Sequence, residues 1–175
     1  MKPSRQIWDK AGLDKALQDL ANKIEQSQKA DGKYSFVGIH TRGVPLARRL
    51  SALMKLDPAA IGVLDINLYR DDLSTVADMP IVRETSLPFS VDGARILLID
   101  DVLYTGRTVR AALDALTDLG RPKKIELLAL IDRGGRELPI QANICGETVK
   151  VADDEVVKVK FVETDGADEV LVAKL

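Results

Sequence analysis

Two adjacent carboxylates, Asp100 and Asp101, follow the apolar run 96–99 and precede a turn rich in hydroxyl groups and glycine. A short continuous apolar run is typical of a strand buried on both faces in a parallel sheet. Ligands of open α/β sheets bind at the carboxyl ends of such strands. A carboxylate pair at that place could bind the diol of a sugar, or a Mg²⁺ ion that prefers oxygen ligands.

The turn that follows has the composition of a phosphate-binding loop. Thr105, Gly106 and Thr108 supply hydroxyl groups and an unhindered backbone at the start of a predicted helix. The unpaired N–H groups and the positive dipole end of a helix N-terminus bind anions. Carboxylates followed by such a loop predict a site for ribose 5-phosphate. The glycine patterns of nucleotide P-loops and dinucleotide-binding folds do not occur in the chain.

The elements that must position this site alternate between strand and helix. The periodicity predicts strands at 34–39, 61–69, 96–99 and 125–132, helices at 10–28, after Gly43 and over 109–119, and short strands at 156–162 and 169–173. Such an alternation favours an α/β fold with a doubly wound, mainly parallel sheet flanked by helices. The segment 70–93 has weak periodicity with scattered proline and glycine, and so long a connection predicts a mobile lid loop.

The composition is that of one globular domain spanning residues 1–175. The chain is 46% hydrophobic and 30% charged, with a net charge of −2, which gives no general attraction to nucleic acid or membrane. Its apolar runs reach about five residues, too short to span a bilayer. The single cysteine, Cys145, has no partner for an internal disulfide and is expected to pack as a small side chain. The cytoplasm is the expected compartment.

Four runs in this sequence resemble the type I phosphoribosyltransferases, and among them the PyrR family of pyrimidine-operon regulators with uracil phosphoribosyltransferase activity. They are 38–43, 65–72, 99–110 and 131–140. The resemblance implies a type I phosphoribosyltransferase fold with a small hood region. It also implies a glycosyltransferase that converts uracil and phosphoribosyl pyrophosphate (PRPP) to uridine monophosphate (UMP) and diphosphate. Mg²⁺ is the implied cofactor, and a dimer or larger homo-oligomer the implied assembly.

The same resemblance assigns roles to individual residues. The PRPP- and nucleotide-binding set is Thr41, Arg42, Gly43, Arg83, Asp100, Asp101, Val102, Leu103, Tyr104, Thr105, Gly106, Arg107 and Thr108. Within it, Arg42, Asp100 and Asp101 are the implied catalytic residues: the arginine holds the diphosphate, and the carboxylates contact the ribose diol and the metal, directly or through water. Arg133 and Val157 are the implied uracil contacts.

Two alternatives stay open at this point. The first is a UMP-responsive attenuator that binds the leader RNA of pyrimidine-synthesis genes and has only secondary enzyme activity. Against it, several positions implied for RNA contact carry residues that are not basic: Gln18, Asp19, Asn22, Gly135, Gln141 and Glu147. From residue 150 onward, 4 lysines oppose 7 acids. The second alternative is transfer to hypoxanthine or guanine, because the central motif does not choose the base.

Overall fold

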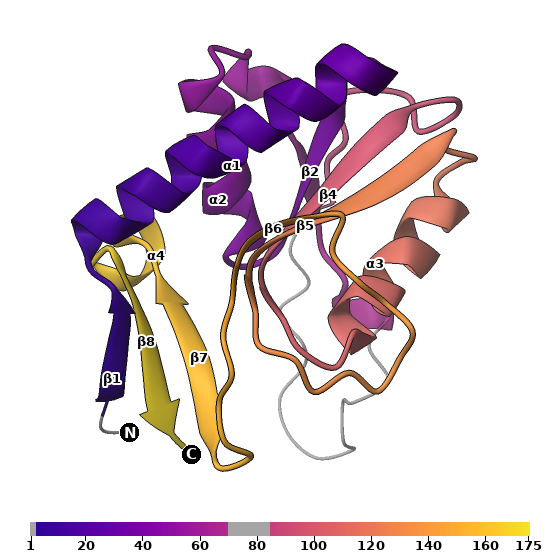
Figure 1. Ribbon diagram of the computed structural model, residues 1–175. Coiled ribbons are helices and arrows are strands. Elements are labelled where there is room, and N and C mark those ends of the chain that lie inside the picture. Colours follow the sequence, from indigo (N-terminus) through magenta and orange to yellow (C-terminus); the bar gives the residue numbers. More distant parts are fainter. Residues whose placement is uncertain (1–2, 70–84) are drawn as a thin grey trace.

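The computed structural model describes residues 3–69 and 85–175, arranged around two sheets (Figure 1). The main sheet has five strands, all parallel, in the order β3-β2-β4-β5-β6. Their bounds are β2 Ser35–Ile39, β3 Gly62–Leu64, β4 Arg95–Leu103, β5 Lys124–Asp132 and β6 Ile144–Thr148. The predicted doubly wound parallel sheet is confirmed.

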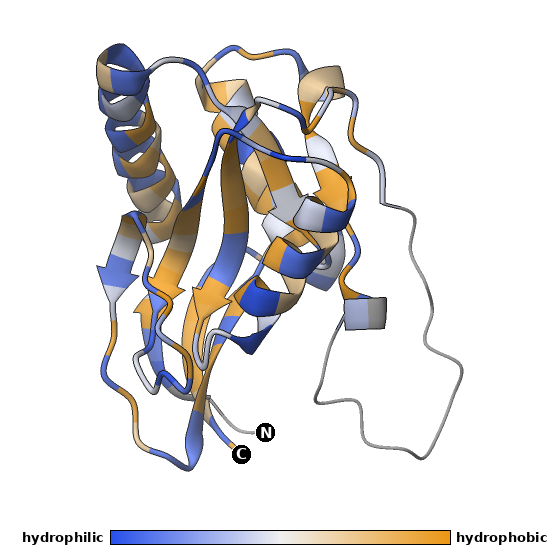
Figure 2. Cartoon of the chain, turned by 90° about the vertical axis from the view of Figure 1, so that its right-hand side faces the viewer, coloured by the Kyte–Doolittle hydropathy of each residue, from blue (hydrophilic) through white to orange (hydrophobic). Residues whose placement is uncertain are grey.

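Helices cover both faces of this sheet. They are α1 Lys10–Asp31, α2 Gly43–Leu53 and α3 Arg107–Asp118. Alternate residues of β4 face opposite sides, so Leu97 and Ile99 share a core with α1 and α2, whereas Ile96 and Leu98 share one with α3. The hydropathy colouring shows the apolar strands enclosed between helices whose outer sides are polar (Figure 2).

A second, smaller sheet joins the two ends of the chain. Its antiparallel strands are β1 Pro3–Trp8, β7 Glu155–Lys160 and β8 Glu169–Lys174, in the order β1-β8-β7, and the short helix α4 Val162–Asp165 lies between β7 and β8. Asp9 then starts α1, because its carboxylate accepts a hydrogen bond from the amide of Gly12 at 2.9 Å. We refer to β1, β7, β8 and α4 as the small sheet unit.

The structure differs from the predicted elements in several places. The expected strand 61–69 stops at Leu64, because the Asp65 carboxylate accepts the amide of Asn67 at 3.0 Å and the chain turns into a 3₁₀ helix, η2 Asn67–Tyr69. Conversely, β4 continues past the apolar run to Leu103, since its acidic end still pairs with β5. Strands β1 and β6 were not predicted, and a second 3₁₀ helix, η1 Pro58–Ala60, precedes β3.

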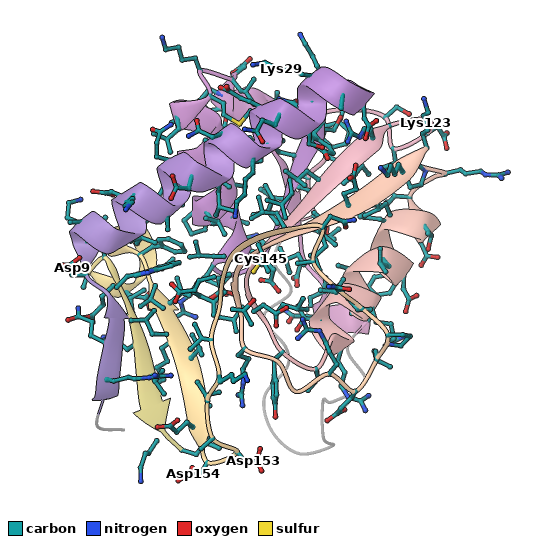
Figure 3. All side chains as sticks on the ribbon, in the orientation of Figure 1. Asp9, Lys29, Lys123, Cys145, Asp153 and Asp154 are labelled. Carbon is teal, nitrogen blue, oxygen red and sulfur yellow. The ribbon has the colours of Figure 1, made fainter. Side chains whose placement is uncertain are left out.

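The lone cysteine, Cys145, is a packed side chain in the structure. Cys145 lies on β6 beside α1 (Figure 3), partly buried, and its thiol donates to the backbone oxygen of Glu147 at 3.4 Å. Burial raises the pKa of the Cys145 thiol, which suits a packed side chain rather than a nucleophile. Across 3–69 and 85–175, the helices lack the combination of length and apolar character needed to cross a bilayer.

Candidate functional site

A pocket of about 360 Å³ opens at the carboxyl end of β4. Its lining residues are Asp100, Val102, Leu103, Tyr104, Thr105, Gly106, Arg107, Thr108, Val109 and Glu137. The pocket thus brings a strand-end carboxylate together with the hydroxyl- and glycine-rich turn, as the sequence predicts. Most of its lining comes from one continuous stretch of chain, which is why local sequence reasoning could find it.

The N-terminus of α3 forms one wall of this pocket. Gly106 occupies the N-cap position with φ +93°, a left-handed conformation that glycine adopts without strain, and α3 has no side-chain cap. Thr105 Oγ1 accepts the amide of Arg107, the first residue of α3, at 3.3 Å. The remaining first-turn amides and the helix dipole suit this wall to an anion such as a phosphate group.

Of the two carboxylates at the end of β4, Asp100 lines the pocket, whereas Asp101, the next residue along the strand, is not among the lining residues. Asp100 is only 7% exposed, and its Oδ1 accepts the amide of Asp101 at 3.0 Å. Burial raises the pKa of the Asp101 carboxyl above its ordinary value, while the neighbouring Asp100 carboxylate and the positive charge of Arg42 act in the opposite direction. The positive charge of Arg42 acts on Asp101, so the loop that carries Arg42 lies near the acidic end of β4.

The loop that carries Thr41 and Arg42 lies between β2 and α2, next to β4 in the sheet. Gly43 permits a close backbone approach, as predicted, but to β4 itself: a Cβ at this position would collide with the carbonyl oxygen of Ile99. The peptide bond between His40 and Thr41 is cis. Absence of a side chain at Gly43 therefore seats this loop against the strand that carries the carboxylates.

Arg42 is not free in this loop but is paired with the small sheet unit. Its Nε and Nη2 donate to Oδ2 and Oδ1 of Asp165 at 3.2 and 2.7 Å, a bidentate ion pair. The hydrogen bonds from Arg42 lower the pKa of the Asp165 carboxyl to about 2. The pair is therefore ionised throughout the neutral range.

The predicted uracil contacts lie on different elements, and neither is among the residues that line the pocket. The guanidinium of Arg133, just after β5, stacks on the Tyr104 ring at 3.7 Å from the ring centre, and its Nε is buried with no hydrogen-bond partner among residues 3–69 and 85–175. Val157, on β7, packs against the same core cluster as Val102 of β4. Arg133 is thus next to the pocket turn, and Val157 lies on the small sheet unit that contacts β4.

Arg136 organises the loop that follows Arg133. It donates to the Asp132 carboxylate and, at 2.8 Å each, to the backbone oxygens of Tyr104 and Ile140. Next to it, Glu137 accepts from Nε of Arg107 at 2.6 Å on the pocket rim. Sequence reasoning did not assign roles to Glu137 or Asp165. The sequence around Asp165 does not indicate a role in the site, because Thr-Asp-Gly is typical of an ordinary turn.

Two predictions fall partly or wholly outside the described chain. Arg83 lies within 70–84, which the structure does not describe. The end of the expected lid, 85–93, is described and is attached to the core: Ser86 forms a β-bridge with Val63, and Val91 is 5% exposed. The lid function of 70–93 therefore stays a prediction.

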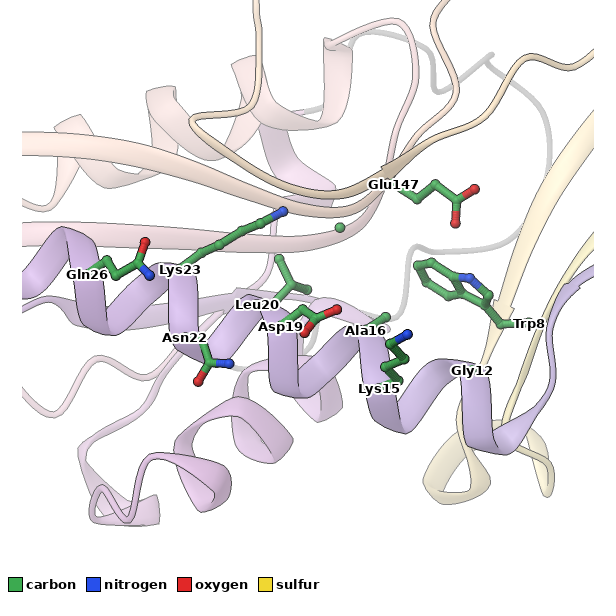
Figure 4. A pocket seen from close by; sticks show the side chains of 11 residues that line it. Trp8, Gly12, Lys15, Ala16, Asp19, Leu20, Asn22, Lys23, Gln26 and Glu147 are labelled. Atoms are coloured by element: carbon green, nitrogen blue, oxygen red, sulfur yellow. The ribbon is translucent and has the colours of Figure 1, made fainter.

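A second pocket, of about 570 Å³, lies between α1 and β6 (Figure 4). Asp19 and Asn22 of α1 line it together with Glu147 of β6, so three of the positions implied for RNA contact converge here. Lys15 and Lys23 also line it, and Lys23 Nζ donates to the Cys145 carbonyl at 2.8 Å. Two lysines therefore face two acids, and the pocket has no excess of positive charge.

The fold and this site define a class of protein. The model of the family described as "Phosphoribosyl transferase domain" matches residues 5–161. Solved structures agree in fold: a hypoxanthine-guanine phosphoribosyltransferase of Bacillus anthracis has a TM-score of 0.73 at 15% identity, with 100% of both chains covered. A Trypanosoma cruzi hypoxanthine phosphoribosyltransferase has a TM-score of 0.72 at 14% identity, covering 98% of this chain and 97% of that one. The chain is a phosphoribosyltransferase-family protein.

More similar relatives narrow the class further. Proteins named "Bifunctional protein PyrR" are 53% identical in Deinococcus radiodurans, over 95% of this chain and 92% of the relative, and 56% identical in Deinococcus deserti, over 96% and 93%. The protein of that name from Thermus thermophilus is 49% identical over 97% of this chain and 96% of its own. The chain belongs to the PyrR family.

Proposed function

We propose that this chain transfers the phosphoribosyl group of PRPP to uracil, releasing UMP and diphosphate. The observation that carries the proposal is the pocket at the carboxyl end of β4, where a buried carboxylate adjoins the hydroxyl-rich turn at the uncapped start of α3. A sugar phosphate presents complementary groups to these two walls, hydroxyls to the carboxylate and an anion to the helix. Membership in the PyrR family supports uracil as the base.

The donor set also fits Mg²⁺. Asp100 and Asp101 offer carboxylate oxygens, while the described residues contain no group of three or more His, Cys, Asp or Glu side chains able to hold a metal. Mg²⁺ is usually bound through one or two carboxylates, with water and substrate oxygens completing its shell. When bound, the ion would supply positive charge near the ribose hydroxyls and the departing diphosphate.

The charged residues of the chain would then stabilise oppositely charged parts of the reacting substrate. In the transfer, the bond from C1 of the ribose to diphosphate breaks, a bond from C1 to N1 of uracil forms, and N1 loses its proton. The ribose becomes cationic as its bond breaks, so Asp100 and Asp101 stabilise it, while Arg42 neutralises the diphosphate. The raised pKa of Asp101 makes it a better proton acceptor for N1 than an ordinary carboxylate.

The turn and the flanking elements complete the proposed site. Thr105, Gly106, Arg107 and Thr108 hold the 5′-phosphate, with Arg133 and Val157 at the base. Arg83 and the rest of 70–84 are proposed to cover the pocket, because a cationic ribose reacts with any water that reaches it. We place this activity in one domain, within a cytoplasmic homo-oligomer.

Incubation of the purified chain with PRPP, Mg²⁺ and one base at a time tests the proposal. We expect chromatography to show UMP and diphosphate with uracil, and no nucleotide with hypoxanthine or guanine. A purine nucleotide in place of UMP would show that the base assignment is wrong. Failure of every base to yield a nucleotide, with the protein folded by circular dichroism, would contradict the enzymatic proposal itself.

RNA binding is a second candidate function, because the relatives are named as bifunctional proteins. We expect little specific binding, since the pocket between α1 and β6 places Asp19 and Glu147 beside its two lysines (Figure 4) and carboxylates repel RNA phosphates. Gel-shift titrations would compare a pyrimidine-operon leader RNA with a scrambled RNA across a salt series, with and without UMP. Tight binding that UMP enhances and scrambling abolishes would show that the protein is a regulator despite these acids.

A further inference from the structure

The ion pair between Arg42 and Asp165 links the small sheet unit directly to the pocket loop. Asp165 is itself held in place by neighbouring groups. Besides Arg42, the Asp165 carboxylate accepts the amide of Phe161 at 3.2 Å and the hydroxyl of Thr164 at 2.7 Å. The Arg42 side chain is 39% exposed and that of Asp165 is 17% exposed, so the pair lies at the edge of the protein interior.

The geometry leaves one part of the guanidinium available. Asp165 occupies Nε and Nη2, the side of the fork, and therefore leaves the Nη1 end for another acceptor. Building on the proposed function, we propose that Asp165 is a positioning residue, which holds Arg42 so that this end of its guanidinium meets the diphosphate of PRPP. Asp165 does not touch the substrate in this proposal and acts only through Arg42.

Anchoring of the small sheet unit does not explain the pair. That task is already performed by Arg49 of α2, which donates to Glu163 at 2.9 and 2.5 Å and to Asp168 at 2.6 Å. Arg49 also stacks over the ring of Phe161, 4.8 Å from its centre, and that ring is fully buried. A partly exposed pair such as that of Arg42 adds little further stability.

For Arg42, the orientation that the ion pair imposes on the side chain matters more than the stability that the pair adds. A free arginine has many rotamers, and ordering it on binding weakens affinity for the anion. Arg42 also interacts electrostatically with Asp101. Without Asp165, the guanidinium would be drawn toward Asp101 and would neutralise a carboxylate that the ribose requires. Asp165 therefore keeps the positive and negative parts of the site apart.

Steady-state kinetics with PRPP and uracil test this role, with Asp165→Asn as the variant and Glu163→Gln as its matched control. Glu163 lies on the same short helix and pairs with Arg49 rather than Arg42. We expect Asp165→Asn to raise KM for PRPP about fivefold to tenfold, with a much smaller change in KM for uracil. Glu163→Gln should change neither KM by more than about twofold. Asp165→Glu, which keeps the carboxylate, should recover part of the loss.

A double-mutant cycle with Arg42→Ala makes the test specific. If Asp165 acts through Arg42, adding Asp165→Asn to Arg42→Ala should leave KM for PRPP at the value of Arg42→Ala alone. A further rise in the double variant, or equal effects of Asp165→Asn and Glu163→Gln, would overturn the inference. The inference would also be overturned if Arg42→Ala raised KM for PRPP while Asp165→Asn left it unchanged. That result would leave the proposed function intact. Absence of UMP formation by the unmodified chain would instead contradict the proposed function.

Discussion

Replacing Asp100 and Asp101 together by asparagine is expected to lower the rate of UMP formation at least about a thousandfold. Asparagine keeps the shape of each side chain. At position 100, its amide oxygen can still accept the hydrogen bond that Asp100 Oδ1 accepts from the backbone amide of Asp101. It removes the negative charge that would stabilise a cationic ribose and bind Mg²⁺. Turnover with saturating PRPP and uracil is the measurement.

The same variant should be at least as stable as the unmodified chain. Asp100 is 7% exposed, and burial raises the pKa of Asp101, so ionisation of the Asp101 carboxyl opposes folding. Neutral amides remove the cost of burying this charge, and thermal unfolding should show an unchanged or higher midpoint. Lost activity in a folded protein would then be due to chemistry rather than to misfolding.

A second acidic pair provides the matched control. Asp153 and Asp154 are exposed at the turn before β7 (Figure 3), and neither is among the residues that line the pocket. Their replacement by asparagine changes the net charge by the same amount and should leave turnover within about twofold of normal, because exposed charges outside the pocket lining contribute little. Near-normal turnover in the Asp100 and Asp101 variant would show that these carboxylates are not catalytic.

The largest stability effect is expected at Arg95, at the amino end of β4 and therefore opposite the pocket. Its Nε donates to Glu126 at 2.9 Å, and its Nη2 donates to the hydroxyl of Tyr34 at 2.7 Å and to Ser27 at 3.1 Å. The side chains of Arg95 and Glu126 are 8% and 9% exposed. Arg95→Met should lower the free energy of unfolding by about 3–5 kcal/mol, because it leaves a buried carboxylate without its main partner.

Removal of both charges should be much less harmful than removal of one. Arg95→Met combined with Glu126→Met replaces the buried ion pair by apolar packing, and should recover at least about half of the lost stability. Urea unfolding of the two variants and the unmodified chain measures both effects. Equal destabilisation in the single and double variants, or a loss below about 1 kcal/mol for Arg95→Met, would contradict this account of the network.

The sequence by itself determined the parts of this protein that depend on neighbouring residues. Helix and strand periodicities predicted the alternating α/β order, because a buried face leaves its mark at every second, third or fourth residue. The main pocket was equally accessible, since residues 100–109 supply both the carboxylate and the phosphate-binding turn within one continuous segment. Chemistry that is local in the chain is readable before the fold is known.

Tertiary structure alone decided which distant segments meet. Strand β1 pairs with β8 although the two lie at opposite ends of the chain, and Arg42 pairs with Asp165 across 123 positions. Asp65 ended a strand that the apolar pattern of 61–69 would have continued. Periodicity reports which face of an element is buried. The partner of a polar side chain depends instead on how the packed elements bring charges together, and no local pattern encodes that choice.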